Sequence, residues 1–489
     1  MSTALVWLRR DLRLTDNPAL AAALAQHGQV LCVYVHAPDE EGSWAPGAAS
    51  RWWLHHSLAA LNAALGQRGS ALVLRTGPTL AALGELAREA QATAIYWNRL
   101  YEPALIARDT AIKQALKAQG LKVESCNANQ LCEPWDIATG SGGPYRVFTP
   151  FWRKLSAQLE PLAPLPAPSR IKGPALKSLA LDELRLRPSI GWDAGFPPNW
   201  QPGEAGAHAL LDGFIAGAVP DYKTARDRPD QAGTSRLSPH LHFGEIGPRQ
   251  IVYALASAGL GEIGAPFVRE LGWREFSTHL LYHFPHSAKA SLNADFERFP
   301  WAEPERETLR AWQRGQTGVP IVDAGMRELW QTGWMHNRVR MIVASYLTKN
   351  LRYHWIHGAR WFWDTLVDAD LANNTQGWQW SAGSGADAAP YFRIFNPVLQ
   401  GQRFDPDGAY VKRFVPELAA LPLKSLHQPW TVAPHLLRAA GLADSAYAKP
   451  IVDLAQSRDA ALAAYRSLRE SNASVAPTRS QRSAVEIPG

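Results

Sequence analysis

The densest set of chemically active side chains is the stretch DADLANNTQGWQW, which runs from Asp368 to Trp380. It combines carboxylates, asparagine amides and indoles within a few helical turns. A core segment has no use for this mixture, because acids and amides are costly to bury without partners. The stretch therefore marks a candidate functional site.

A second cluster lies in RELGWREF, where Glu270, Trp273 and Arg274 fall three and four residues apart. This spacing predicts one helical face that carries an acid, an indole and a guanidinium. An amphipathic surface helix with an ion pair explains the same residues equally simply.

The stretch GWMHNRVRM repeats the combination, because Asn337 and Met341 are four apart and Trp334 lies three residues before Asn337. Here too an ordinary amphipathic helix is the simpler alternative. Two clusters that join a tryptophan to hydrogen-bonding groups suit a planar heteroaromatic ligand. The indole would pack on its face, and the polar groups would bond its edge.

The stretch GTSRLSPHLHFGEI begins at Gly233 and supplies hydroxyls at Thr234, Ser235 and Ser238. Ser238 precedes a proline, a residue favoured at the first position of a helix. Free N–H groups at a helix start, with hydroxyls nearby, form a ready phosphate site. Helix capping needs the same residues, and the motif alone favours capping.

Three histidines, His279, His283 and His286, have the spacing of one helical face. They lack the acidic residue of an HExxH motif, so we expect structural histidines and no metal site. The chain has three cysteines and no CxxC pair, which predicts neither a disulfide framework nor a zinc site.

The composition describes a folded, water-soluble chain. It has 489 residues, 46% hydrophobic and 19% charged, enough for at least two domains. No segment is long and apolar enough to span a bilayer, and charged residues interrupt the N-terminal stretch where a signal peptide needs an apolar core. We expect a cytoplasmic monomer. A net charge of +6 permits a polyanionic partner.

The first part of the chain alternates between short β segments and Ala/Leu-rich helical segments. The expected strands are Ala4–Leu8, Val30–Val35, Ala71–Arg75, Ala94–Trp97 and Lys122–Cys126. Strands alternating with helices predict a doubly wound parallel five-stranded sheet. Such sheets bind small molecules beyond the carboxyl ends of their strands.

The rest of the chain has a different organisation. Prolines crowd residues 161–202, which excludes a continuous helix there and predicts a long surface linker. Helical periodicity dominates after about residue 205. We therefore expect an α/β domain at 1–130, a linker at 131–204, a helical domain at 205–475 and a flexible tail at 476–489.

Tryptophan is unusually common, with 20 residues in the chain. Several of them gather between Trp330 and Trp380. A large aromatic core explains this enrichment, and so do surfaces that stack bases or a cofactor, or that carry electrons.

Taken together, the motifs resemble those of the photolyase and cryptochrome flavoproteins. The stretches LVWLRRDLRLTDNPAL, GTSRLS, WREF, TGWMHNRVRM, DADLANNTQGWQW and APYFRIFNPVLQGQRFDPDG occur in that family's order and span nearly the whole chain. Within the family, the chain is most similar to bacterial class I photolyases that repair cyclobutane pyrimidine dimers in DNA.

The resemblance implies an N-terminal antenna domain and a C-terminal helical domain that holds FAD. It reverses the preference at GTSRLS, where phosphate binding becomes favoured over capping. The residues that would hold FAD are Tyr222, Thr234, Ser235, Arg236, Leu237, Ser238, Phe267, Glu270, Arg274, Arg340, Asp368, Ala369, Asp370 and Asn374. Among these, Asn374 matches the asparagine that faces flavin N5.

The resemblance also implies an electron path and a DNA site. Trp378, Trp355 and Trp301 would carry electrons from the surface to oxidised flavin, in the order inner, middle and outer. The residues that would contact damaged DNA are Arg226, Glu270, Trp273, Asn337, Arg338, Met341, Trp380 and Arg393. Glu270, Asn337 and Asn374 would be catalytic. Glu270 would have to be protonated, or to act through a neighbour, to help a transient anion.

Two details bear on specificity. Photolyases for the (6-4) photoproduct carry histidines at the positions of Asn337 and Met341, so this chain is expected to act on the cyclobutane dimer. Folate-binding members carry an Asn-Glu pair where this chain has Ala104 and Leu105. We expect a second antenna chromophore, 5,10-methenyltetrahydrofolate or a deazaflavin.

One departure from the family pattern lies next to the expected flavin contacts. Thr375 and Gln376 replace the family's Asn and Gly, which affects the loop contacts but not Asn374. Two other functions compete with repair. A cryptochrome-type photoreceptor would use the same flavin without repairing DNA, and a nucleotide-binding protein with an aromatic core would lack the ordered motifs.

Overall fold

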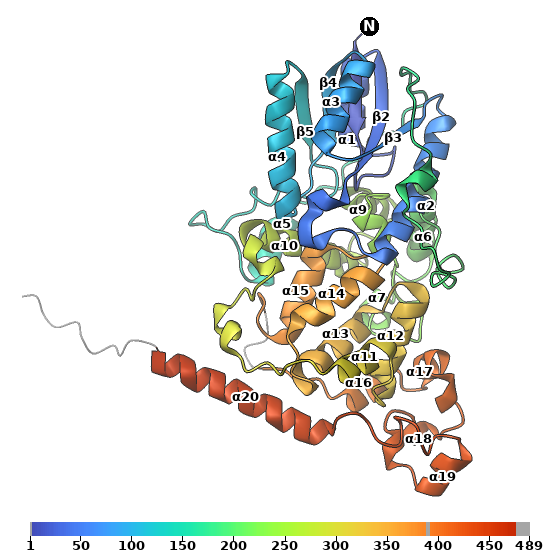
Figure 1. Cartoon of the computed structure of the whole chain (residues 1–489), viewed down its shortest axis with the longest axis vertical. Helices are drawn as coiled ribbons and strands as arrows, with labels where there is room; N and C mark the ends of the chain where they lie inside the picture. The colour runs from blue at the N-terminus through green and yellow to red at the C-terminus, as the bar shows by residue number, and fades with distance from the viewer. Residues whose placement is uncertain (1, 388–391, 476–489) are drawn as a thin grey trace, which may run out of the picture.

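The computed structural model describes residues 2–387 and 392–475, which form an α/β part followed by a helical part (Figure 1). The expected tail at 476–489 lies outside the described residues. In Figure 1 the α/β part occupies one end of the molecule, and the long helix α20 (Leu454–Val475) crosses the other.

The N-terminal sheet confirms the predicted strands. They are β1 (Thr3–Trp7), β2 (Gln29–His36), β3 (Leu72–Thr76), β4 (Ala92–Asn98) and β5 (Lys122–Cys126). All pairs are parallel, in the order β3-β2-β1-β4-β5. The order reverses direction at β1, which makes the sheet doubly wound and opens a crevice at its carboxyl edge.

Four helices cover the two faces of the sheet: α1 (Pro18–Gln26), α2 (Ala48–Gly66), α3 (Thr79–Glu89) and α4 (Pro103–Ala118). Alternate strand residues point to opposite faces. Val6 and Cys32 pack with α1 and α2 on one face. Leu5 and Val33 pack with α3 and α4 on the other. Both faces are therefore buried, as a parallel sheet requires.

The expected linker at 131–204 is more structured than the sequence indicated. It contains helix α5 (Phe148–Ser156), whose Phe148 and Phe151 are fully buried. The proline-rich part has no α-helix, as predicted, but it is bound to the sheet: the N–H of Val30 donates to the Lys172 carbonyl at 2.7 Å. The linker therefore packs against both parts.

The helical part begins at residue 204. Its helices are α6 (Glu204–Ala216), α7 (Tyr222–Ala225), α8 (Ser238–His242), α9 (Pro248–Ser257), α10 (Ala265–His283), α11 (Arg306–Arg314), α12 (Pro320–Thr332), α13 (Asn337–Ser345), α14 (Trp355–Thr365), α15 (Leu371–Ala382), α16 (Pro397–Phe404), α17 (Ala409–Phe414), α18 (Leu423–Leu426), α19 (Pro434–Ala439) and α20. Short 3-10 turns connect several of them.

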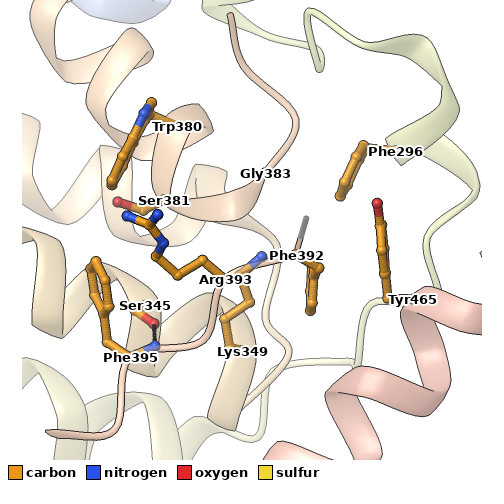
Figure 2. A pocket seen from close by; sticks show the side chains of 10 residues that line it. All are labelled: Phe296, Ser345, Lys349, Trp380, Ser381, Gly383, Phe392, Arg393, Phe395 and Tyr465. Carbon is orange, nitrogen blue, oxygen red and sulfur yellow. Dashed lines mark hydrogen bonds between the residues drawn. The ribbon is translucent and has the colours of Figure 1, made fainter. Parts of the chain in front are cut away.

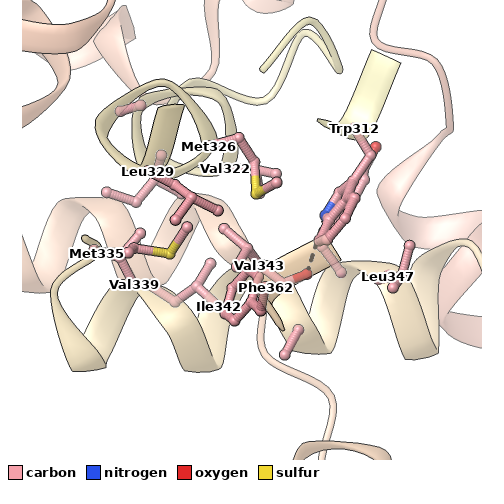
Figure 3. Packing of buried hydrophobic residues seen from close by; sticks show 14 of the residues in the cluster. Trp312, Val322, Met326, Leu329, Met335, Val339, Ile342, Val343, Leu347 and Phe362 are labelled. Atoms are coloured by element: carbon pink, nitrogen blue, oxygen red, sulfur yellow. Dashed lines mark hydrogen bonds between the residues drawn. The ribbon is translucent and has the colours of Figure 1, made fainter. Parts of the chain in front are cut away.

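The core of the helical part forms around α12, α13 and α14. Trp312 is fully buried there, and its indole N–H donates to the Val343 carbonyl at 3.3 Å (Figure 3). Phe362 stacks nearly parallel to Trp312, with ring centroids 6.5 Å apart. Many of the tryptophans are thus core residues, which confirms the simpler explanation for part of the enrichment.

A buried arginine joins the two parts of the molecule. Arg13 follows β1 and is fully buried. Its guanidinium donates to the carbonyls of Asp16, Ala128 and Gly244, each at 2.8 Å. Because Gly244 belongs to the helical part and Ala128 follows β5, this one side chain fixes the strand ends against the helices.

Two of the three histidines, His279 and His283, lie against the linker backbone at Pro134. The Nδ1 atom of His279 lies 3.0 Å from the Pro134 carbonyl, and its Nε2 accepts from the Tyr145 N–H. The prediction that His286 shares this helical face is wrong, because α10 ends at His283 and His286 lies in a separate turn. Among the described residues, no cluster could hold a metal ion, and no helix has the length and apolarity of a membrane span.

Helix α10 also carries a buried acid that faces the linker. Glu275 is 3% exposed, and its carboxylate accepts from the Leu131 N–H at 2.9 Å. Burial raises the pKa of Glu275 to about 8, although Arg274 and the backbone donors partly oppose this. The folded state therefore binds this proton more strongly than the unfolded chain does.

We predict that Glu275→Gln changes how stability depends on pH. The raised pKa makes wild-type stability fall as pH rises from about 4.5 to 8, because the unfolded chain releases the proton first. The neutral amide removes this loss, so the stability difference between variant and wild type should change in favour of the variant by about 4 kcal/mol from pH 5 to pH 9. Chemical denaturation at pH 5 and pH 9 measures it, and an equal difference at both would contradict it.

Candidate active site

One pocket of about 430 Å³ opens in the helical part. We call it the central pocket. Helices α10, α13, α14 and α15 form its walls, with the segment before α15 and the residue after α7. The predicted residues that line it are Arg226, Glu270, Trp273, Arg274, Asn337, Arg338, Arg340, Met341, Asp368, Ala369, Asp370, Asn374, Trp378 and Trp380.

The helical spacing of these residues explains why they meet. On α10, Glu270, Trp273 and Arg274 share one face, as predicted, and all line the pocket. Ser277 lies on the same face and also lines it, although the sequence analysis did not select it. Its spacing of seven residues from Glu270 is the signal that would have found it.

An ion pair connects α13 to the segment before α15. The Arg340 guanidinium donates to both carboxylate oxygens of Asp368, at 2.8 and 3.1 Å, and its Nε–H donates to the Met335 carbonyl at 2.7 Å. Asp368 is only 8% exposed. A charge-assisted bond of this kind fixes both side chains in one orientation at the pocket wall.

The second acid of the motif starts helix α15. The Asp370 carboxylate accepts from the Asn373 N–H at 2.9 Å, so it caps the helix. Burial by itself would raise the pKa of Asp370, but the bond and charge of His242, with the charge of Arg274, hold the pKa below its usual value. Asp370 therefore supplies a negative charge at the pocket wall over a wide pH range.

The two candidate catalytic asparagines lie on different walls. The amide nitrogen of Asn374 donates to the Ala359 carbonyl on α14 at 2.9 Å. This bond fixes the amide plane and leaves its oxygen as the acceptor for a ligand. Asn337 is the first residue of α13, directly after His336, which caps that helix.

Glu270 forms an ion pair with Arg226, the residue that follows α7. Both side chains are about one-quarter exposed. An ionised Glu270 would repel an anion unless a neighbour offset its charge. The Arg226 guanidinium lies in the position to do so at the pocket wall.

Helix α5 of the linker holds the Trp273 side chain in place. The Trp273 ring stacks on Phe148 of α5, with centroids 3.6 Å apart and planes at 10°. Next to it, Gly272 lies so close to Trp152 that a Cβ would meet the indole at 2.3 Å. Helix α5 thus orients the predicted stacking residue, and nothing in the sequence pattern indicated this long-range contact.

The GTSRLS segment does not line the central pocket. Thr234 and Ser235 lie in the loop before α8, and the Ser235 hydroxyl accepts from the Leu237 N–H at 3.3 Å. The Arg236 guanidinium lies over Trp200, 4.2 Å from the ring centroid. Ser238 begins α8 and accepts from the Trp334 indole N–H. Phosphate binding by this segment stays a prediction.

Two other predicted cofactor residues, Tyr222 and Phe267, are buried together with Leu237 of this segment in one apolar cluster. The rings of Tyr222 and Phe267 meet edge to face, with centroids 5.2 Å apart. The Arg226 guanidinium lies over the Tyr222 ring, 5.5 Å from its centroid. None of the three residues lines the central pocket.

The three tryptophans of the predicted electron path lie on or beside helix α14. Trp378 lines the pocket and packs on α14 at Gly358, where an added Cβ would meet its ring at 2.0 Å. Trp355 begins the same helix and is fully buried. The His354 ring lies between the outer two residues, 5.4 Å from Trp355 and 5.2 Å from Trp301.

The last predicted DNA residue lies beside the pocket. Arg393 lines a small neighbouring cavity of about 30 Å³ (Figure 2). Trp380 lines both cavities, so Arg393 is one side chain away from the central pocket. Several lining residues were not selected from the sequence: Ser277, Ala344, Phe362, Leu366, Asn373, Gln376, Gly377 and Ser381.

The donor set suits the isoalloxazine ring of FAD. The pocket volume lies in the usual range for small-ligand sites. The Asn374 amide, the Arg340–Asp368 pair and Asp370 offer both acceptors and donors to the polar edge of a planar ring. Phe362, Leu366 and Trp378 offer it apolar surface. The residues present therefore fit the cofactor that the motifs imply.

We predict that Asp368→Asn weakens flavin binding about tenfold. The change is nearly isosteric, but Arg340 loses its charged partner, and charge-assisted bonds contribute roughly 1.5–3 kcal/mol. Flavin absorbance per protein after dialysis measures the effect. Asp444→Asn, on an exposed residue away from the pocket, serves as the matched control. Full flavin retention by Asp368→Asn would remove the pair from the site.

Comparison with known families agrees with this geometry. Residues 4–169 match the DNA photolyase family, and residues 267–467 match the family described as the FAD binding domain of DNA photolyase. The second match covers α10 to α20 and therefore most of the central pocket. FAD binding is thus supported independently of the pocket.

Similar proteins include both enzymes and photoreceptors. The deoxyribodipyrimidine photo-lyase of Agrobacterium fabrum is 48% identical, covering 95% of this chain and 98% of that protein. Cryptochrome-1 of Arabidopsis thaliana is 40% identical, covering 93% of this chain and 69% of that protein. The solved structure of a bacterial class III photolyase from Agrobacterium tumefaciens has a TM-score of 0.92 and 47% identity, covering 96% of this chain and 98% of that one.

These similarities confirm the family but not its branch. The motifs led us to expect class I, whereas one highly similar structure is named class III, so the branch stays a prediction. The shared length, the two domain matches and the arrangement of the central pocket all agree. The chain belongs to the photolyase/cryptochrome family of flavoproteins.

Proposed function

We propose that this protein is a deoxyribodipyrimidine photolyase, which uses light and reduced FAD to split cyclobutane pyrimidine dimers in DNA. One observation supports this most strongly. Half of the residues expected to hold flavin, and all of those expected to touch the lesion except Arg393, line a single pocket. Electron transfer requires the donor and acceptor to be close, and one shared pocket provides that proximity.

The pocket would recognise the lesion from two walls. Asn337 would hydrogen-bond a pyrimidine edge from α13, and Glu270 would do so from α10. Arg226 would neutralise the Glu270 carboxylate with which it pairs, so that this wall does not repel a transient dimer anion. Met341, with no imidazole on this wall, favours the cyclobutane dimer over the (6-4) product.

The DNA would have to present the lesion outside the duplex, as photolyases require. A flipped base costs less when it is damaged, which adds selectivity. Trp273 and Trp380 offer indole faces for stacking. Arg338 and Arg393 would contact the phosphate backbone, and the net charge of +6 is consistent with this.

When bound, reduced FAD supplies one electron to the dimer after absorbing light and takes it back once both cyclobutane bonds have opened, with no net redox change. The protein's residues position and tune this chemistry. Asn374 would offer a neutral oxygen to flavin N5, because its nitrogen is bound to Ala359. The Arg340–Asp368 pair would hold the ring's polar edge.

We also propose that a second chromophore binds the crevice at the carboxyl edge of the sheet. Tyr34, His36 and Arg108 line this crevice from the α/β part. Ala369 lines both the crevice and the central pocket, so light energy captured there would pass through one thin wall. Leu105 makes this wall apolar where folate-binding members have an acid, and the ligand would be 5,10-methenyltetrahydrofolate or a deazaflavin.

A cryptochrome-type photoreceptor is the second candidate, because a plant cryptochrome is 40% identical to this chain. A repair assay separates the two. Protein with reduced flavin would be illuminated with DNA carrying one cyclobutane thymine dimer, with a dark control and a (6-4) substrate. Light-dependent repair of the cyclobutane substrate alone supports the enzyme. No repair by a protein that binds and photoreduces flavin would support the photoreceptor.

We predict that Trp273→Ala keeps flavin but weakens binding to dimer-containing DNA. Loss of one base–indole stack should cost about 1–3 kcal/mol. Equilibrium binding to damaged and undamaged duplexes measures the change, with Trp273→Phe as the variant that keeps an aromatic face on Phe148. Unchanged affinity for damaged DNA would remove Trp273 from the lesion site.

We predict that Trp378→Phe slows photoreduction of oxidised flavin and spares repair by enzyme that was reduced beforehand. The benzene ring is much harder to oxidise than indole, so the path loses its first member. Illumination with an external reductant measures the rate, with Trp52→Phe, a buried tryptophan of the α/β part, as control. Lost repair in the prereduced variant would show that Trp378 does more than relay electrons.

A further inference from the structure

A fully buried lysine lies beside the central pocket. Lys349 belongs to a π-helical turn (Tyr346–Asn350) that continues α13, and its exposed fraction is 0%. Burial lowers the pKa of Lys349 well below its usual value. A buried cation is costly unless it has partners, and π-helical turns inside helices are frequent at functional sites. The photoreduction and repair chemistry described above does not use this residue.

The ammonium has two partners from other segments. It donates to the Ala382 carbonyl, the last residue of α15, at 2.5 Å. It also lies over the Phe392 ring, 3.3 Å from the centroid. Both contacts favour the protonated form, because the carbonyl and the ring face are negative. Lys349 thus joins α13, α15 and the segment that contains Phe392.

The Phe392 ring is held from its other side by helix α20. The Tyr465 ring stacks on it with centroids 4.6 Å apart and planes at 9°. Figure 2 shows Phe392 between the Lys349 ammonium and the Tyr465 ring. We call these three residues the aromatic clamp.

Helix α20 packs against the rest of the helical part. Ala461, Ala464 and Leu468 are buried against Phe296 and Phe299. At its start, the Ser457 hydroxyl accepts from the Asn350 amide at 2.9 Å, directly beside Lys349. The helix therefore acts as a rigid support for the clamp.

The clamp holds the edge of the central pocket. Arg393 follows Phe392 directly, and two residues later the Phe395 N–H donates to the Ser345 hydroxyl of α13 at 3.1 Å. Trp380 lies two residues before Ala382, whose carbonyl Lys349 binds. Arg393 and Trp380, which are expected to contact DNA at this edge, are thus positioned by the aromatic clamp. The clamp residues do not line the central pocket.

We propose that Lys349 and Tyr465 are positioning residues that set the geometry of Arg393 and Trp380 for damaged DNA. The inference deepens the proposed function and rests on it. It assigns a role to α20, which makes no part of the central pocket among the described residues. Neither residue is expected to affect flavin binding or photoreduction.

Two variants test the clamp. Tyr465→Ala removes the ring that supports Phe392, and Lys349→Met removes the ammonium but keeps an unbranched side chain. Each should raise the Kd for dimer-containing DNA about 3- to 10-fold, the size of one aromatic contact. Tyr465→Phe keeps the stack and should bind like wild type. Ser467→Ala, an exposed residue of the same helix, is the matched control.

A double-mutant cycle shows whether the effect passes through the pocket edge. If it does, Tyr465→Ala combined with Arg393→Ala should bind little more weakly than Arg393→Ala alone. Flavin absorbance and the photoreduction rate should match wild type in every variant. Fully additive effects, or wild-type Kd in Tyr465→Ala, would overturn the inference.

The same experiment separates this inference from the proposed function. Wild-type protein that binds damaged and undamaged DNA equally would contradict the proposed function itself. Wild-type protein that prefers damaged DNA, with variants that bind equally well, would contradict only the clamp. Loss of flavin in Tyr465→Ala together with unchanged flavin in Tyr465→Phe would show that α20 supports the whole fold and would also overturn the positioning role.

Discussion

The ion pair between Arg340 and Asp368 is the contact on which the site depends. It connects α13 to the segment that leads into α15, and Asp370 then starts α15 by capping it. Each of these helices contributes residues of both predicted kinds, some expected to hold flavin and some expected to touch the lesion. Any change in the angle between the helices would separate the two sets, and the charged pair at their junction fixes that angle.

Support for this junction comes from regions outside the pocket. Helix α5 of the linker stacks Phe148 on Trp273, and Arg13 fixes the sheet against the helices near residue 244. The crevice of the sheet shares Ala369 with the central pocket. The α/β part thus supports the pocket, and its crevice, the proposed site of the second chromophore, is adjacent to it.

Local patterns predicted much of this architecture. The five strands were found because apolar runs alternate with helical periodicity, and Glu270, Trp273 and Arg274 were grouped because their spacing places them on one helical face. The sequence could not indicate α5, whose aromatic residues lie in a proline-flanked segment and find partners far away in the chain.

Two other differences have similar causes. Lys349 reads as an ordinary polar residue in YLTKN, and only tertiary packing buries it. His286 continues the helical spacing, but Pro285 ends the helix before it. For the GTSRLS segment, the resemblance to known flavoproteins implies a phosphate site, while the described loop packs Arg236 on Trp200, so its role depends on the bound cofactor.

If flavin and lesion occupy one pocket in contact, the excited flavin must transfer its electron directly to the lesion. The most direct measurement is the excited-state lifetime of the bound reduced flavin, with and without DNA that carries a cyclobutane dimer. Contact predicts a clearly shorter lifetime with damaged DNA, because the dimer accepts the electron, and no change with an undamaged duplex of the same sequence. An unchanged lifetime at saturating damaged DNA would show that the lesion does not reach the flavin.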